Sequence, residues 1–283
     1  DCLLSRGLGD VYKRQAKAMG NRVMSLEHHG WSVVVEFLGP EGGPGVICLP
    51  GMGDIRSVYR HLTEPLVSRG YRVALVDLPG LGESEAGPEP SQVDIAHLVV
   101  DLAEGLDSPA IVIAHSYTPD SALLASQISP SIVGVLAIGP WATTPELDPF
   151  MRAVSRIVSR TPWLWGWFYR SLHKRPPADL KDHVRAIRSS LRRAGGTSTL
   201  QRMALGVGKD ATDRRKLTTV PVGIVMGSAD PDFKDPLAEA EAFAQGLDAA
   251  ITLAEGCGHY PHTEDPDAVL EAFDMLSRRI DSD

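Results

Sequence analysis

Three residues that could perform nucleophilic catalysis follow one another along the chain, Ser116, Asp230 and His259. Each stands just after a run of residues typical of a β-strand. A serine hydroxyl is a weak nucleophile at neutral pH, so it needs an adjacent base, and a histidine oriented by a carboxylate is suited to that role. The serine and the aspartate are 114 residues apart, and the aspartate and the histidine are 29 apart. The first gap leaves room for an inserted segment, whereas the second fits a single helix and strand.

Ser116 lies where a strand-like run, residues 110–115, passes directly into a segment that Pro119 could start as a helix. A strand that runs straight into a helix makes a sharp turn, and a serine at its apex holds its hydroxyl above the edge of the sheet. Serine is also a favoured helix N-cap, so this position alone does not establish a nucleophile. The aspartate and the histidine downstream favour the catalytic interpretation.

Four segments of the chain resemble the α/β-hydrolase family, in particular bacterial members with a helical cap. They are Leu49-Pro-Gly-Met-Gly-Asp-Ile-Arg-Ser-Val-Tyr-Arg60, Asp77-Leu-Pro-Gly-Leu-Gly-Glu-Ser84, Gly227-Ser-Ala-Asp-Pro-Asp-Phe233 and Gly256-Cys-Gly-His-Tyr-Pro261. Serine, aspartate and histidine also follow the chain order of that family's triad. The resemblance runs from about residue 33 to about residue 280. It implies the fold and the catalytic machinery better than the substrate, because this fold hosts many chemistries.

The resemblance also implies a role for the residues around the nucleophile. His259 is the general base, because it alone among the histidines stands in a Gly-x-Gly-His-x-Pro setting after the last strand. The family pattern Gly-x-x-Asp selects Asp230 as the acid over its rival Asp232. Two backbone N–H groups, those of Met52 and Tyr117, would form the oxyanion hole that stabilises the negative oxygen of acyl transfer.

The turn that carries the nucleophile departs from the family pattern. The usual Gly-x-Ser-x-Gly reads Ala114-His-Ser-Tyr-Thr118 in this chain. Glycine relieves crowding where strand, turn and helix meet closely, and threonine is larger and β-branched. We therefore expect the turn to be slightly shifted or repacked around Thr118. His115 adjoins the nucleophile, and we expect its side chain to point elsewhere.

The rest of the chain alternates between strand-like and helix-like segments. Alternation of this kind predicts an α/β fold, a mostly parallel doubly wound sheet with helices on both faces. In such sheets ligands bind beyond the carboxyl ends of the strands, where the three candidate residues fall. The predicted strands are residues 33–37, 46–49, 73–76, 111–114, 133–138, 222–226 and 251–253, and the predicted helices include 57–68, 93–106 and 237–247.

The alternation stops after Ile138 and resumes near Val220, which predicts an inserted helical cap over residues 141–216. The core domain would then comprise residues 24–140 and 217–283. Within the insertion, apolar residues recur at helical spacing beside a parallel basic stripe, which predicts an amphipathic helix. The apolar positions are Leu180, Val184, Ile187 and Leu191, and the basic ones are Lys181, Arg185, Arg188 and Arg192.

The cap is basic and rich in tryptophan. Residues 151–216 carry a net charge of +12 within a chain of net charge −8, so the remainder carries −20. We expect the basic stripe to form a solvated face that complements the acidic core domain. The tryptophans Trp163, Trp165 and Trp167, together with Trp141 after a strand, are candidates for an apolar acyl pocket. They could equally form the cap's own core, or with the arginines a membrane-surface contact.

Composition bounds the remaining possibilities. No apolar run approaches the ~20 residues that span a bilayer, and no signal peptide follows Met19 or Met24. Three scattered cysteines are too few for a disulfide framework or a zinc site, so we expect a reduced, cytoplasmic setting. Residues 1–18 are set apart from the fold. The segment Asp10-Val-Tyr-Lys-Arg-Gln15 is typical of a sequencing-library scar in a metagenomic assembly, and a disordered tail is the alternative.

The sequence thus predicts a serine hydrolase that cleaves a small or medium apolar carboxylic ester, thioester or lactone through an acyl-enzyme. We expect no metal, no organic cofactor and no nucleic-acid partner, and the sequence carries no signal for an oligomeric state. A C–C bond hydrolase, a cofactor-free perhydrolase and a non-catalytic ligand-binding protein are the alternatives. Dehalogenases and epoxide hydrolases of this fold need a carboxylate nucleophile, so a serine at position 116 disfavours those activities.

Overall fold

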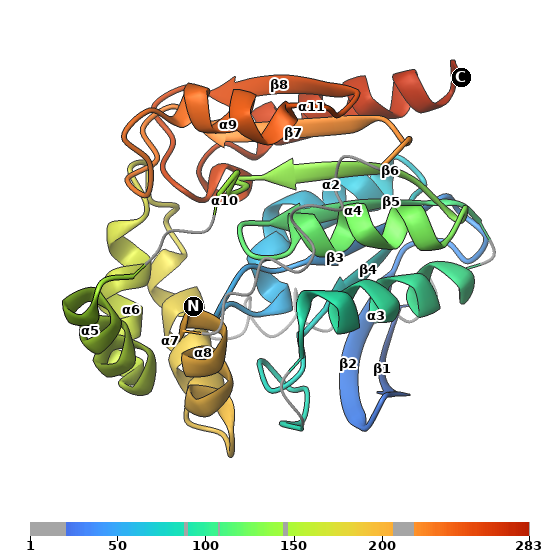
Figure 1. Cartoon of the computed structure of the whole chain (residues 1–283). Coiled ribbons are helices and arrows are strands. Elements are labelled where there is room, and N and C mark those ends of the chain that lie inside the picture. The colour runs from blue at the N-terminus through green and yellow to red at the C-terminus, as the bar shows by residue number, and fades with distance from the viewer. Residues whose placement is uncertain (1–20, 88–89, 107, 144–146, 206–217, 283) are drawn as a thin grey trace, which may run out of the picture.

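A single mostly parallel sheet forms the centre of the molecule (Figure 1). The computed structural model describes residues 21–87, 90–106, 108–143, 147–205 and 218–282. In these residues the strand order is β1-β2-β4-β3-β5-β6-β7-β8. The two pairings of β2, with β1 and with β4, are antiparallel, and all the others are parallel. The strands are β1 (Arg22–His28), β2 (Trp31–Leu38), β3 (Gly45–Leu49), β4 (Arg72–Val76), β5 (Ala110–His115), β6 (Ile132–Ile138), β7 (Val222–Gly227) and β8 (Ala249–Ala254).

The predicted fold class is confirmed, and all seven predicted strands lie inside observed ones. Strands β3, β4, β5 and β7 are buried at every position, as expected for parallel strands covered on both faces. The sequence analysis missed β1. This strand lies at the edge of the sheet and most of its residues are exposed or half-buried, so it lacks the continuous apolar run of the central strands.

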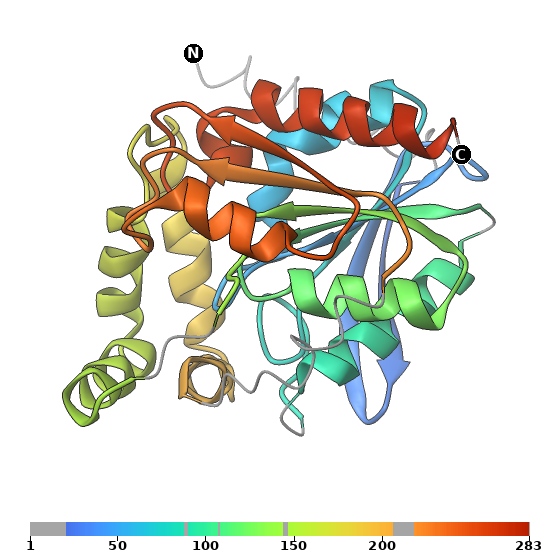
Figure 2. The same ribbon diagram turned by 45° about the horizontal axis from the view of Figure 1, so that its top comes forward.

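Helices cover both faces of the sheet (Figure 2). Helices α2 and α11 lie on one face, and α3, α4 and α9 lie on the other. A short 3-10 helix, η1 (Arg56–Tyr59), leads directly into α2. The bounds are α2 (Arg60–Ser68), α3 (Gln92–Glu104), α4 (Pro119–Ile128), α9 (Pro236–Ala244), α10 (Pro261–Glu264) and α11 (Pro266–Ile280).

Several helices begin at a short polar side chain that satisfies a free backbone N–H. Asp235 and Asp265 each precede a proline at the first helical position, and each carboxylate accepts a hydrogen bond from the N–H three residues on. Ser91 and Asp94 form a reciprocal capping box at the start of α3. These caps set where the helices that flank the site begin.

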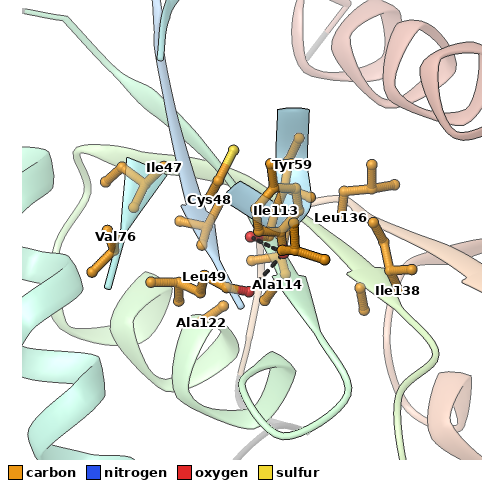
Figure 3. Close-up of a cluster of buried hydrophobic side chains, with 14 of the residues drawn as sticks. Ile47, Cys48, Leu49, Tyr59, Val76, Ile113, Ala114, Ala122, Leu136 and Ile138 are labelled. Atoms are coloured by element: carbon orange, nitrogen blue, oxygen red, sulfur yellow. Dashed lines mark hydrogen bonds between the residues drawn. The ribbon is translucent and has the colours of Figure 1, made fainter. Parts of the chain in front are cut away.

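The core between the strands is apolar and closely packed, and Figure 3 shows the part nearest the site. Tyr59 is fully buried there, and its hydroxyl donates a hydrogen bond of 2.6 Å to the carbonyl oxygen of Leu49. The same hydroxyl lies 3.5 Å from the carbonyl oxygen of Ile113. Tyr59 therefore ties η1 to the ends of β3 and β5, which are the strands that lead into the nucleophile and its neighbouring loop.

Among the described residues, four helices lie between β6 and β7, and we call them the cap: α5 (Pro149–Arg160), α6 (Pro162–Ser171), α7 (Leu180–Leu191) and α8 (Gly196–Leu205). They lie together at one end of the sheet (Figure 1). Helix α7 is the predicted amphipathic helix, and its four apolar positions are buried. The predicted end of the cap at residue 216 and the predicted tail over residues 1–18 lie outside the described residues. Among the described helices, none is both long and apolar enough to cross a membrane.

Gly227 lies at the end of β7. Because it has no side chain, the loop after β7, which carries Asp230, can pack against the loop after β8, which carries His259. A Cβ at this position would lie 1.9 Å from the carbonyl oxygen of Gly258 and 2.5 Å from that of Cys257. We therefore expect Gly227→Ala to lower the free energy of unfolding by roughly 1–3 kcal/mol through overpacking, measured by urea denaturation. Gly105→Ala, at the end of α3 where φ is −78°, is the control and should change stability much less. Equal effects would show that the close approach at Gly227 is not needed.

Candidate active site

Ser116 stands at the sharp turn between β5 and α4. Its φ is 54°, in the left-handed region that residues with a side chain rarely adopt. Its backbone N–H donates a 2.8 Å hydrogen bond to Ile138 on the neighbouring strand β6, which fixes the turn to the sheet. This is the strained strand-to-helix turn that displays a nucleophile. The side chain is half-buried, at the carboxyl end of the central strands.

His259 joins Ser116 to Asp230 through two short hydrogen bonds. Its Nε2 lies 2.9 Å from Ser116 Oγ, and its Nδ1 lies 2.7 Å from Asp230 Oδ2. Both His259 and Asp230 are almost fully buried. A carboxylate can only accept, so Nδ1 carries the proton and Nε2 is free to accept the hydroxyl proton of the serine. The structure brings together the three residues that the sequence analysis selected.

The electrostatics of His259 suit a base that must hold a proton during the reaction. Burial lowers its pKa, but the charge of Asp230 and the hydrogen bond to it outweigh that effect, with further contributions from Asp232 and Glu264. The net shift is upward from the usual value of 6.5. The site therefore stabilises the imidazolium form that arises during proton transfer.

The loop after β3 lies directly against the nucleophile. A Cβ added at Gly51 would lie 2.7 Å from His115 Nδ1 and 3.2 Å from Ser116 Cβ, so only glycine fits this approach. Met52 is the next residue in that loop, and Tyr117 directly follows the nucleophile. Tyr117 thus stands beside Ser116 in the chain, Met52 follows the glycine that approaches Ser116, and both residues are half-buried. Their role as donors is part of the proposal below.

Thr118 replaces the expected glycine without leaving its hydroxyl unpaired. The side chain is fully buried, and its Oγ1 lies 3.2 Å from the carbonyl oxygen of Leu49 and 3.1 Å from that of His115. The same oxygen accepts a 3.1 Å hydrogen bond from the His115 N–H. The hydroxyl thus ties the turn to the end of β3, and the expected shift or repacking of the turn stays a prediction.

A buried polar cluster connects the same loop to the cap. The Asp54 carboxylate is fully buried and accepts hydrogen bonds from His183 Nε2 on α7, at 2.8 Å, and from the Tyr169 hydroxyl on α6, at 2.9 Å. Burial raises the pKa of Asp54, but the charge of His183 and the hydrogen bonds outweigh it and hold the pKa below its ordinary value. Asp54, two residues beyond Met52, is therefore an anion that is hydrogen-bonded to side chains of two cap helices.

The cap also holds the loop that carries the histidine. The backbone N–H of His259 donates a 2.9 Å hydrogen bond to Leu172, just after α6. The carboxylate of Glu264 accepts from the N–H of Gly258 at 3.1 Å and from that of Lys174 at 2.8 Å. Sequence reasoning missed this carboxylate, although it lies only five residues beyond His259 in the same segment. The cap therefore supports the loop of His259 directly through hydrogen bonds.

The histidine beside the nucleophile has a structural role, as expected. His115 Nε2 donates a 2.9 Å hydrogen bond to the main-chain carbonyl of His259. Burial, together with the nearby His259, lowers the pKa of His115 to about 3, so it stays neutral at any working pH. Its ring packs between those of His259, Tyr260 and His262. It supports the loop of the base and makes no hydrogen bond to the serine.

The four predicted pocket tryptophans divide into two groups. Trp165 is buried, and its Nε1 donates a 3.2 Å hydrogen bond to the carbonyl oxygen of Gly53 in the loop beside the nucleophile. Trp141 packs edge-to-face on Phe233, with the ring centres 4.8 Å apart. Trp163 and Trp167 are 60% and 69% exposed, so they do not form a buried roof over the site. Helical spacing explains this, because residues two apart on α6 point to different sides.

The described residues contain one group with metal-ligand geometry, formed by Asp230, Asp232 and His259. Their potential ligand atoms lie within 4.8 Å of one another. Two of these atoms, Asp230 Oδ2 and His259 Nδ1, are already joined by the 2.7 Å hydrogen bond of the triad. Two of the three groups are therefore already engaged with each other.

The fold agrees with the comparisons to known proteins. Residues 46–272 match the Alpha/beta hydrolase family, and the chain belongs to this family. It is 39% identical over 87 residues to epoxide hydrolase 2 of Siraitia grosvenorii, which covers 31% of this chain and 27% of that protein. It is 26% identical over 270 residues to polyketide synthase ThaQ of Burkholderia thailandensis, which covers 87% of this chain and 13% of the synthase. The chain thus spans about a quarter or less of these two curated relatives.

Solved structures with different activities share the fold. An esterase from Exiguobacterium antarcticum superposes with a TM-score of 0.76 at 16% identity, over 92% of this chain and 100% of the esterase. A bromoperoxidase from Bacillus anthracis gives 0.75 at 16% identity, over 92% and 100%. A 2-hydroxy-6-oxo-6-phenylhexa-2,4-dienoate hydrolase from Rhodococcus gives 0.74 at 15%, over 92% and 99%. At these identities the likeness concerns the fold alone.

The hydrogen bonds of Thr118 provide a test of how the turn is held. Thr118→Val keeps the shape but leaves the buried N–H of His115 without this acceptor, so we expect a loss of roughly 1–3 kcal/mol in the free energy of unfolding. Thr118→Ser retains the hydroxyl and should lose much less. Urea denaturation of the two variants makes the comparison. A valine variant as stable as the serine variant would contradict the assigned role.

Proposed function

We propose that the protein is a serine hydrolase that cleaves a small or medium apolar carboxylic ester through an acyl-enzyme on Ser116. The observation that carries this proposal is the continuous hydrogen-bonded chain from Ser116 through His259 to Asp230, at 2.9 and 2.7 Å. The left-handed backbone conformation of Ser116 supports it, because such strained conformations cluster at functional sites. Membership of a family of hydrolases supports it further.

In the first half of the reaction, the proton of Ser116 Oγ passes to His259 Nε2 as the oxygen attacks the ester carbonyl. A new C–O bond forms, and the carbonyl oxygen becomes negative. The backbone N–H groups of Met52 and Tyr117 would donate to that oxygen, and a lost donor of this kind costs ~3–4 kcal/mol. The bond to the leaving alcohol then breaks, and His259 returns the proton to the alcohol oxygen.

In the second half, a water molecule gives a proton to His259 Nε2 and attacks the acyl carbon. The bond to Ser116 Oγ breaks, the carboxylic acid leaves, and the serine recovers its proton. Asp230 holds the imidazole in the tautomer that serves both halves. The cap would contribute by fixing the loop of Met52 through Asp54 and the loop of His259 through Glu264.

A thioester is the second candidate substrate, because it is cleaved by the same two steps. The similarity to polyketide synthase ThaQ over most of this chain favours it. Epoxide hydrolysis is disfavoured despite the similarity to epoxide hydrolases, since Ser116 offers no carboxylate for an alkyl-enzyme ester. C–C hydrolysis and perhydrolysis by the same triad are alternatives without a specific observation in their favour.

The nucleophile can be tested by covalent labelling. A fluorophosphonate probe should react with Ser116 alone, because a base lies within reach of its oxygen, and hydrolysis of p-nitrophenyl butyrate should be lost in Ser116→Ala. Ser121→Ala, on α4, is the control and should keep both labelling and turnover. Mass spectrometry of the labelled peptide identifies the residue. Labelling or turnover that survives in Ser116→Ala would refute the assignment.

The raised pKa of His259 predicts the pH dependence. The base must be neutral to accept the serine proton, so kcat/KM should be low in acid and rise to a plateau, with a midpoint above 6.5. Asp232 contributes to the upward shift, so Asp232→Asn should move the midpoint to lower pH. Asp235→Asn, at the exposed start of α9, should leave it in place. Initial rates from pH 5 to 9 provide the profile, and a shift to higher pH in Asp232→Asn would contradict the electrostatic assignment.

A further inference from the structure

A second carboxylate stands beside the base, on the side where the reaction takes place. Asp232 Oδ2 lies 3.7 Å from His259 Nε2, the nitrogen that also bonds to Ser116 Oγ. The triad carboxylate, in contrast, lies at Nδ1, on the opposite edge of the ring. Asp232 takes no part in the proposed mechanism. Its backbone N–H donates a 2.9 Å hydrogen bond to the carboxylate of Asp230, which lies in the same loop.

The position of Asp232 identifies the part of the substrate that it would meet. His259 Nε2 protonates the leaving alcohol, so that oxygen must come within hydrogen-bonding distance of the nitrogen. A group 3.7 Å from the same nitrogen then lies next to the alcohol part of the ester.

The charge of Asp232 is not balanced by a permanent cation in the described part of the chain. Its ion-pair partner there is His259, and no arginine or lysine of the described residues lies within ion-pair distance. The side chain is only 20% exposed. Burial raises the pKa of Asp232, and the charge of Asp230 raises it further, whereas the charge of His259 lowers it. A carboxylate in this situation gains from any cation that a ligand brings to it.

Two aromatic residues belong to the same region as Asp232. Phe233 follows Asp232 directly, and its ring centre lies 6.3 Å from that of His259. Trp141 packs on Phe233, and both residues are half-buried. The segment that leads to Trp141 also borders the base, because a Cβ at Gly139 would lie 3.2 Å from His259 Cε1. Aromatic faces next to a carboxylate are the surroundings that bind ammonium groups in proteins.

We propose that Asp232, Phe233 and Trp141 form a cation subsite for the leaving alcohol, and that the enzyme prefers esters of alcohols that carry an ammonium group. This inference rests on the proposed serine hydrolase function and names the substrate class of the same site. It also explains why the loop carries two acidic residues. Asp230 serves the imidazole, and Asp232 serves the substrate.

A pair of esters with the same shape and different charge tests the subsite. Butyrylcholine and 3,3-dimethylbutyl butyrate differ by a quaternary nitrogen in place of a carbon. Wild-type kcat/KM should favour butyrylcholine by roughly tenfold or more at the pH plateau, because the carboxylate attracts only the cation. Asp232→Asn should remove most of that preference, whereas Asp235→Asn removes the same charge from an exposed position in the same loop and should retain it.

Binding of choline to Ser116→Ala separates the subsite from the reaction. Choline should bind more tightly than 3,3-dimethylbutanol, and the added Asp232→Asn change should abolish the difference, measured by calorimetry. A wild-type enzyme without preference for the cationic ester, or equal losses on both esters in Asp232→Asn, would overturn the subsite and leave Asp232 as a partner of His259. Absence of turnover on every ester, with choline still bound through Asp232, would instead overturn the proposed hydrolase function.

Discussion

The left-handed backbone at Ser116 is the constraint on which the rest of the site depends. A residue with a side chain in this conformation costs ~1–2 kcal/mol, and only the surrounding structure can hold it there. Three contacts do so. The N–H of Ser116 bonds to Ile138, the hydroxyl of Thr118 bonds back to the end of β3, and Gly51 allows the neighbouring loop to approach within contact distance. The result is a hydroxyl fixed above the sheet, where His259 can reach it.

The cap and the sheet share the task of positioning the remaining groups. The hydrogen bonds of Asp54 with His183 and Tyr169 anchor the loop of Met52 to α7 and α6. Glu264 and Leu172 anchor the loop of His259 to the segment after α6. A buried carboxylate with good partners is costly to break, because an unpaired charge would remain inside the protein. The cap is thus joined by hydrogen bonds to two loops of the candidate site.

Sequence reasoning predicted the features that depend on local pattern. The central strands were found because they are buried on both faces, and α7 was found from its spacing of apolar residues. His183 also lies on that apolar face, and a histidine in such a position indicates a buried polar partner. Its partner, Asp54, lies 129 residues earlier, so no local pattern pairs the two residues. Helical spacing could have separated Trp165 from Trp163 and Trp167. The contact of Thr118 with His115 is local, whereas its hydrogen bond to Leu49 depends on a strand 69 residues earlier in the sequence.

The central claim, that Ser116 carries the acyl group, is tested most directly by trapping the intermediate. Rapid mixing of the enzyme with p-nitrophenyl butyrate, followed by an acid quench and mass spectrometry, shows whether the protein is acylated and where. We predict a burst of about one equivalent of p-nitrophenol per active site and a butyryl group on the peptide that contains Ser116. Steady turnover without acylated protein, or a butyryl group on any other residue, would contradict the assignment of the nucleophile.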